Sequence, residues 1–224
     1  KSKGYVKAKH ISTAADIGDE PLELYNKFRH EVPVYVCEKR CEGARQILTD
    51  KEEHVTAIVL DDAYQHRYIH RDINIMLTDY ARLFTLDKVI PEGRLREHPK
   101  GADRADIIVV TKCPHDLTTE EADSIRQNIA PKPHQHVFFT TILHNTLIQA
   151  SPESTALPAG TDLSRKKILI FTGIAKPTPL IEHYKAICPS VNTIKFPDHH
   201  AFTSANISNI NNFVIIMYIT LDQV

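Results

Sequence analysis

The chain has 224 residues, of which 42% are hydrophobic and 25% charged, and its formal net charge is −1. This length suits one large domain or two small ones with a real core, and the balanced charge argues against a general nucleic-acid binder, which usually carries a strongly basic face. No run of about 18 apolar residues occurs, so the sequence predicts neither a membrane span nor a signal peptide.

Apolar runs alternate with amphipathic helical patterns along the chain. Strands are predicted at residues 32–36, 56–60, 73–78, 107–111, 137–141, 167–172, 191–196 and 213–220. Helices are predicted at residues 21–29, 42–52, 118–129, 179–187 and 203–212. Several strands are continuously apolar, as expected where helices cover both faces of a sheet. The pattern therefore indicates an α/β fold with a mostly parallel sheet and flanking helices.

Turn-forming residues suggest where this fold divides. Residues 149–163 are rich in Ser, Pro, Thr and Gly and are predicted to be a linker between a domain at 1–148 and a smaller α/β portion at 164–224. Four cysteines, without any C-x-x-C pair, are predicted to be reduced and mostly buried thiols of a cytosolic protein.

The segment at residues 57–67 carries two adjacent carboxylates, Asp61 and Asp62, directly after an apolar run. In open α/β sheets, ligands bind at the carboxyl edge of the strands, and adjacent like charges are unfavourable without a cation. An Asp after a strand commonly holds Mg²⁺ beside nucleotide phosphates. The segment is therefore interpreted as a metal-and-phosphate site, with a solvated acidic turn as the alternative.

Three further segments place ionisable side chains beside turns. Asp19 follows Gly18 and is either a helix cap or a general base at a helix mouth. Arg96 and Glu97 lie in a long connection, where they suit phosphate and metal binding or form an exposed charged loop. The run Asp198-His199-His200 follows a predicted strand and suits an oriented catalytic or metal-binding imidazole, or else a helix N-terminus capped by Asp198.

Together these segments resemble one family. The stretches are Gly18-Asp19-Glu20-Pro21, Asp61-Asp62-Ala63-Tyr64-Gln65-His66-Arg67, Pro91-Glu92-Gly93-Arg94-Leu95-Arg96-Glu97, Thr172-Gly173-Ile174-Ala175-Lys176-Pro177 and Asp198-His199-His200. In this order they resemble the tetraacyldisaccharide 4′-kinases of lipid A biosynthesis. The resemblance runs from Gly4 to about Asn212.

The resemblance implies a P-loop NTPase-like kinase that uses ATP and Mg²⁺. Such a kinase phosphorylates the 4′-hydroxyl of a tetraacyl glucosamine disaccharide 1-phosphate at the cytoplasmic face of the bacterial inner membrane. By motif, Asp19 resembles the catalytic base and His199 its partner. Metal ligands are expected from Asp61, Asp62 and Glu97. Contacts to the lipid A precursor are expected from Gln65, His66, Arg96 and Arg40.

Three departures qualify the resemblance. The sequence contains no G-x-x-x-x-G-K-[ST] motif, Ala63 stands where the family usually has Gly, and the acidic-lysine turn expected after the last strand is missing. The chain also starts without Met. We therefore expect an incomplete P-loop fold, an inactive fragment of a longer kinase whose missing N-terminal segment binds the membrane peripherally.

Two other functions remain open at this point. A metal-dependent phosphoesterase could use the Asp and His clusters to hold two ions, since paired metals suit in-line hydrolysis. A kinase-like remnant without catalysis is the second alternative, and the absent phosphate-binding motif favours it.

Overall fold

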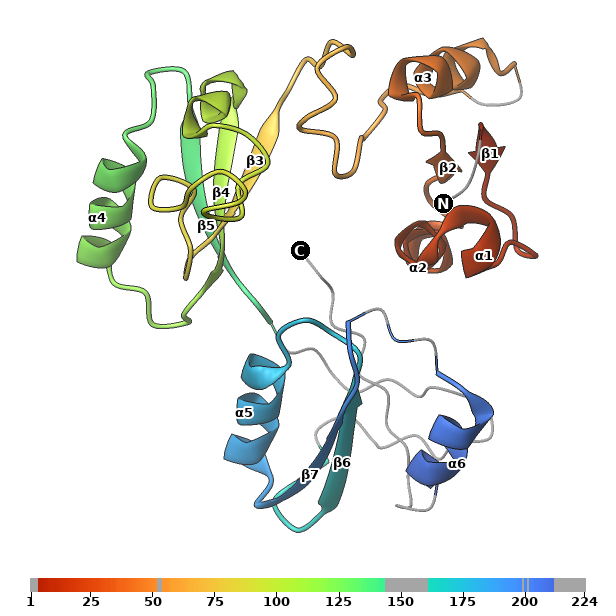
Figure 1. The fold of residues 1–224 in the computed structure, drawn as a ribbon, viewed down its shortest axis with the longest axis vertical. Helices are drawn as coiled ribbons and strands as arrows, with labels where there is room; N and C mark the ends of the chain where they lie inside the picture. The colour runs from red at the N-terminus through yellow and green to blue at the C-terminus, as the bar shows by residue number, and fades with distance from the viewer. Residues whose placement is uncertain (1–3, 52–53, 144–160, 199, 201, 212–224) are drawn as a thin grey trace. The chain divides into compact units, whose positions relative to one another are not determined.

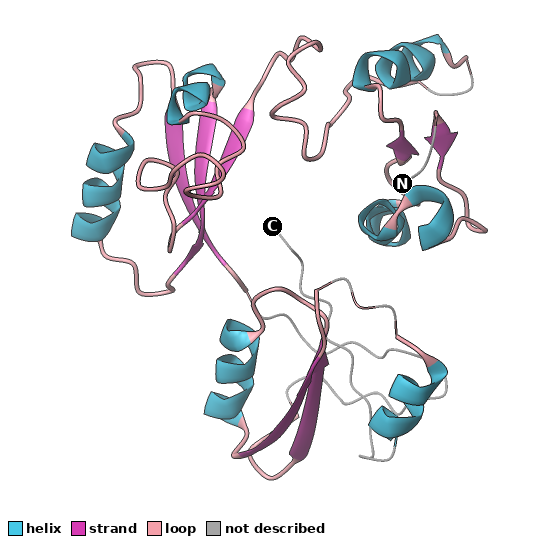
Figure 2. Ribbon diagram, in the orientation of Figure 1, coloured by secondary structure: helices cyan, strands magenta, loops and turns pink. Residues whose placement is uncertain are grey.

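The computed structural model describes residues 4–51, 54–143, 161–198, 200 and 202–211 (Figure 1). The chain divides into two compact units, Lys1–Thr141 and Ile142–Val224. Helices alternate with strands along both units, which confirms the α/β class (Figure 2). The predicted linker at 149–163 lies largely outside the described residues.

The first unit begins with five short elements: β1 (Val6–Lys7), α1 (Ala14–Ile17), α2 (Asp19–Phe28), β2 (Tyr35–Val36) and α3 (Arg40–Thr49). β1 and β2 pair in antiparallel orientation. Gly18 separates α1 from α2 with a φ of 97°, a conformation that glycine adopts without steric cost. α2 begins earlier than the predicted helix at 21–29, and the acidic residues of its first turn complement the helix dipole.

The central feature of the first unit is a parallel sheet of β3 (Ile75–Asp79), β4 (Ile107–Cys113) and β5 (His136–Thr141), in that order. The strands predicted at 73–78, 107–111 and 137–141 are thus confirmed. A 3₁₀ helix at Pro99–Arg104 precedes β4, and α4 (Thr119–Ile129) joins β4 to β5. The Thr118 hydroxyl accepts a hydrogen bond from the Glu121 amide at 3.2 Å, and the Glu121 side chain accepts one from the Thr118 amide, so a capping box starts the helix predicted at residues 118–129.

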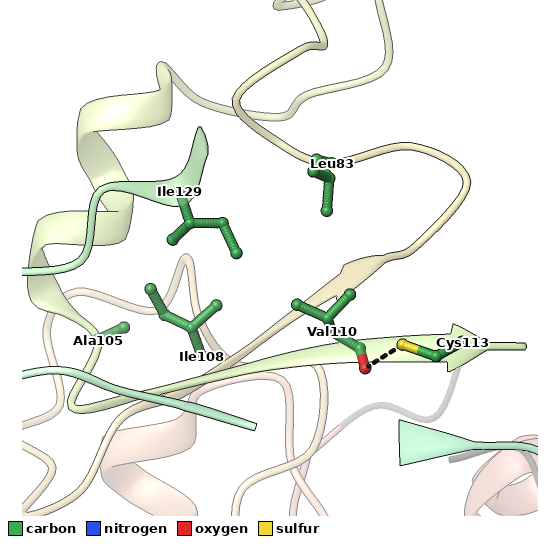
Figure 3. Packing of buried hydrophobic residues seen from close by; sticks show 6 residues of the cluster. All are labelled: Leu83, Ala105, Ile108, Val110, Cys113 and Ile129. Atoms are coloured by element: carbon green, nitrogen blue, oxygen red, sulfur yellow. Dashed lines mark hydrogen bonds between the residues drawn. The ribbon is translucent and has the colours of Figure 1, made fainter. Parts of the chain in front are cut away.

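One face of this sheet forms a packed core. The buried side chains are Leu83, Ala105, Ile108, Val110, Cys113 and Ile129 (Figure 3). Ile108 and Val110 lie on alternate residues of β4 and therefore point to the same side of the sheet. Burial of each such aliphatic side chain contributes about 1.5–3 kcal/mol.

The opposite face of the same sheet is apolar and largely exposed. Leu77, Val109 and Phe138 are aligned across the three strands, and Ile75 lies opposite Ile107. The side chains of Ile75, Leu77 and Phe138 are 55%, 57% and 54% exposed. Parallel sheets usually have both faces covered, so this apolar surface is unusual for its class.

The strand predicted at residues 56–60 is absent, and this prediction was wrong. Residues 57–60 have no regular secondary structure, and Val59 is 93% exposed. Within the described part of the chain, no backbone hydrogen bond involves these four residues. A strand is stabilised by the ladder that a neighbour provides, and no described strand pairs with this segment.

The second unit contains the parallel pair β6 (Lys167–Thr172) and β7 (Ser190–Lys195), with α5 (Thr178–Ile187) between them and α6 (Ser204–Asn211) after β7. Its core consists of Ile168, Ile170, Leu180, Ile181, Tyr184 and Cys188. These elements match the predictions at 167–172, 179–187, 191–196 and 203–212 within a residue or so at each end. The strand predicted at 213–220 lies outside the described residues.

Two bulk predictions can be compared with the structure. All four cysteines are free, and Cys37, Cys113 and Cys188 are buried, as predicted for reduced thiols. Among the described residues, no helix has the length and apolar character needed to cross a membrane.

Candidate functional site

The candidate site centres on a turn formed by residues 61–66. Asp62 has a φ of 42°, in the left-handed region that most side chains avoid, and the His66 amide donates to the Ala63 carbonyl at 2.9 Å. Arg71 Nη1 donates to the carbonyl oxygens of Ala63 and Tyr64 at 2.8 and 3.4 Å. The turn is therefore held through its backbone, which leaves the exposed carboxylate of Asp61 and the exposed side chain of Gln65 accessible.

Arg96 connects this turn to the loop that precedes the 3₁₀ helix. Its Nη1 atom lies 3.1 Å from both carboxylate oxygens of Asp62. Both side chains are about two-thirds exposed, so this ion pair contributes at most about 1 kcal/mol. Its importance is positional, because it brings together two predicted site segments that are far apart in the sequence.

Glu97 is engaged by a different arginine. Arg104 Nη2 lies 2.6 Å from Glu97 Oε1, and the Arg104 guanidinium stacks 4.8 Å from the centre of the Tyr64 ring. The hydrogen bond to Glu97 raises the pKa of Arg104, and burial raises the pKa of the Tyr64 phenol. The Tyr64 hydroxyl donates to the Gly101 carbonyl at 2.9 Å. We define Tyr64, Glu97, Gly101 and Arg104 as the clamp.

The three predicted metal ligands are not gathered in one place. Within the described part of the chain, no group of three or more His, Cys, Asp or Glu side chains could hold a metal ion. Asp61 and Asp62 are adjacent, whereas the carboxylate of Glu97 is bound to Arg104. The two-metal phosphoesterase alternative therefore gains no support from the described residues.

Two predicted residues lie in the N-terminal segment of the first unit. Asp19 is the first residue of α2 and is exposed at its N-terminus, a position compatible with both a dipole partner and a base. Arg40 is the first residue of α3, and its Nη1 atom donates to the Cys37 carbonyl. Arg40 therefore stabilises the local backbone in addition to any contact with a ligand.

The Asp198-His199-His200 run follows β7 at the carboxyl end of the second sheet. His199 itself lies outside the described residues. The ring of His200 stacks on Phe196 at 4.6 Å, and its Nε2 atom lies 3.1 Å from Asn206 Oδ1. The nearby helix α6 is capped by Thr203, whose hydroxyl accepts from the Asn206 amide, so Asp198 is not the helix cap.

Sequence reasoning missed several residues that shape the site. Tyr64, Arg71 and Arg104 hold the turn, and the sequence predictions gave none of these three side chains a role. Asp79 at the end of β3 lies 3.7 Å from Lys112 at the end of β4, where Lys112 has a φ of 60°. Asp79 ends an apolar run, as Asp61 follows one, but only the run before Asp79 forms a strand among these described residues. The carboxyl edge of this sheet therefore lies at Asp79.

The fold has a close counterpart among solved structures. A crystal structure of LpxK from Aquifex aeolicus in complex with ATP matches with a TM-score of 0.65 and 25% sequence identity, over 91% of this chain and 61% of that chain. The parallel sheets and this likeness define the class of the protein as an α/β fold of the P-loop kinase type.

Sequence comparisons narrow the class to a family. The family described as Tetraacyldisaccharide-1-P 4′-kinase matches residues 1–217. The tetraacyldisaccharide 4′-kinase of Bacteroides thetaiotaomicron is 39% identical over 93% of this chain, and that of Flavobacterium johnsoniae is 38% identical over 95%. The chain belongs to the tetraacyldisaccharide 4′-kinase family. It spans 57% and 60% of the length of these two relatives.

Proposed function

We propose that this chain is part of a kinase that transfers the γ-phosphate of ATP to the 4′-hydroxyl of a tetraacyl glucosamine disaccharide 1-phosphate. The family match over residues 1–217 supports the reaction class. The observation that carries the proposal is the contact between Arg96 and Asp62, because it joins the two segments that carry the most specific part of the family resemblance.

Phosphoryl transfer depends on positioning and on neutralising charge more than on covalent chemistry. Mg²⁺ usually takes one or two carboxylates and keeps several waters, so Asp61 and Asp62 form a donor set that fits it. When bound, the ion neutralises charge on the transferred phosphoryl group. Asp62 would exchange its ion pair with Arg96 for the metal, and the released guanidinium would be free to bind a phosphate oxygen in the bidentate manner of arginine.

Proton transfer needs a base near the acceptor hydroxyl. We assign that role to Asp19, with His199 as the residue that supports it. A carboxylate can accept the proton of a bound hydroxyl, and Asp19 is exposed at the N-terminus of α2.

We assign recognition of the lipid to four polar side chains. Gln65, His66 and Arg96 at the acidic turn, together with Arg40 at the start of α3, supply hydrogen-bond donors suited to sugar hydroxyls and to the 1-phosphate. The acyl chains of such a substrate remain in a bilayer, so we propose that the enzyme works peripherally at the cytoplasmic face of the inner membrane. Co-sedimentation of the intact gene product with inner-membrane vesicles checks this placement.

The decisive experiment is an assay of the intact gene product that contains this chain. With γ-labelled ATP, Mg²⁺ and tetraacyl disaccharide 1-phosphate, one label per lipid is expected at the 4′ position, located by NMR. A matched substrate with a blocked 4′-hydroxyl should accept none. ATP consumption that is independent of the lipid, or a label at another position, would refute the proposed reaction.

A further inference from the structure

The clamp is built around the side chain of Glu97. A Cβ atom placed on Gly101 would lie 2.6 Å from Glu97 Cδ and 2.8 Å from Oε2, so a larger residue at position 101 would shift this carboxylate from its observed position. On its other side the carboxylate meets Arg104 at 2.6 Å. Arg104 and Glu97 are each less than one-third exposed, which shields their ion pair from solvent more than most surface pairs.

The clamp is also attached to the acidic turn. Tyr64 follows Asp61, Asp62 and Ala63 directly, and its ring is covered by the Arg104 guanidinium at 4.8 Å. Its hydroxyl is bound to the Gly101 carbonyl. Because Ala63 between them is buried, a displacement of Tyr64 would be transmitted to the backbone of the two aspartates.

We propose that Arg104, together with Tyr64 and Glu97, is a positioning unit that holds the Asp61–Asp62 turn in the conformation required for divalent-metal binding. This inference rests on the proposed function, which assigns the metal to these two aspartates. It gives Glu97 a different task from the one the family resemblance implies: its carboxylate orients Arg104 and does not coordinate the ion.

The two possible roles of Glu97 predict different metal affinities for a variant that lacks Arg104. If Glu97 coordinates the metal, removal of Arg104 frees its carboxylate, and metal affinity is unchanged or rises. If Glu97 orients Arg104, removal of either residue loosens the same turn, and metal affinity falls in both cases. Residues that orient metal ligands typically cost 10–100-fold in metal affinity when mutated.

The test uses Mn²⁺ alone as the probe, with the intact gene product and without lipid. The Kd for Mn²⁺ is measured by EPR of the free ion, and thermal unfolding is recorded for every variant. Arg104→Gln and Glu97→Gln are each expected to raise the Kd about tenfold. The double variant is expected to match the single ones, because both changes disrupt one unit. The double variant Asp61→Asn, Asp62→Asn should abolish the site.

Arg126 provides a matched control on α4. It also stacks on an aromatic ring, Phe139, at 4.8 Å, and pairs with a carboxylate, Asp123, at 2.9 Å, but among the described residues no hydrogen bond or ion pair joins it to the acidic turn. Arg126→Gln should lower the melting temperature slightly and leave the Kd unchanged. A merely structural role of Arg104 would give that same pattern for Arg104→Gln and would overturn the proposal.

Further outcomes are equally decisive. An unchanged Kd in Arg104→Gln beside a raised Kd in Glu97→Gln would make Glu97 a direct ligand. No Mn²⁺ binding by the unmodified protein, or binding that survives loss of both aspartates, would also overturn the proposal.

If Arg104→Gln does not fold, Tyr64→Phe provides a milder variant, because it removes only the hydrogen bond to Gly101. An unchanged Kd for Mn²⁺ in Tyr64→Phe counts against the clamp. A protein that passes this test but transfers no phosphate to the lipid would overturn the proposed function alone.

Discussion

Arg71 offers a direct test of how the acidic turn is held. Its Nη1 atom donates to the Ala63 carbonyl at 2.8 Å and, more weakly, to the Tyr64 carbonyl at 3.4 Å. Arg71→Met removes both donors and keeps most of the apolar stem, so packing is largely preserved. The Ala63 carbonyl then keeps the hydrogen bond from the His66 amide.

The loss of stability of the turn in Arg71→Met can be estimated from the lengths of the two hydrogen bonds of Arg71. A hydrogen bond to a charged group contributes about 1.5–3 kcal/mol, and only the shorter contact has good geometry. Since the Ala63 carbonyl keeps its second partner, we expect a loss near the lower limit, about 1.5 kcal/mol. A difference of about 1.4 kcal/mol corresponds to a factor of ten in an equilibrium, so local opening of the turn should become about tenfold more frequent.

Amide hydrogen exchange measures this opening directly. The His66 amide should exchange about tenfold faster in Arg71→Met, while amides of β4 keep their protection. Arg67→Met, an exposed arginine in the same segment, is the matched control and should leave His66 unchanged. Equal exchange of His66 in both variants and the unmodified protein would refute the idea that Arg71 holds the turn.

Three further predictions concern the core, alkaline pH and catalysis. Ile108→Ala in the packed face should lower the free energy of unfolding, measured in urea, by about 2–5 kcal/mol. Ile75→Ala on the exposed face should lower it by less than about 1 kcal/mol, and similar losses in the two variants would contradict the difference in burial between the two faces. Burial raises the pKa of Tyr184 above its ordinary value of 10.0, so the stability contributed by the neutral phenol is complete below about pH 10 and is lost as the pH rises through the raised pKa. Tyr184→Phe should therefore flatten the fall in melting temperature at alkaline pH, and an unaltered fall would argue against this role of the Tyr184 phenol. Asp19→Asn in the intact gene product should lower kcat more than it raises KM, and a change confined to KM would remove Asp19 from the role of base.

Local patterns predicted most of the secondary structure. The continuous apolar run at residues 107–111 predicted β4, which pairs with a strand on each edge, and the helical pattern at residues 118–129 predicted α4. These signals succeed because they depend on a few adjacent residues. The run at 57–60 is continuously apolar, like the first residues of β4, but has no pairing partner among the described strands, so the same signal failed there.

The arrangement of the site was much harder to predict. Arg96 meets Asp62 across 34 positions of sequence, and Tyr64 meets Gly101 across 37. No periodicity encodes such contacts, because they depend on how a long irregular loop returns to the turn. The sequence identified Glu97 as an ionisable residue of interest, but it gave no sign of the ion pair with Arg104 or of the close approach of Glu97 to Gly101.

The exposed face of Ile75, Leu77 and Phe138 has a practical consequence for every measurement above. Apolar patches of this kind promote self-association, and association that favours the folded state makes an apparent melting temperature depend on protein concentration. Stabilities and Mn²⁺ affinities of variants are therefore comparable only when each is measured over a dilution series. Replacing Phe138 by a charged residue should remove that dependence and provide a better-behaved background for the other substitutions.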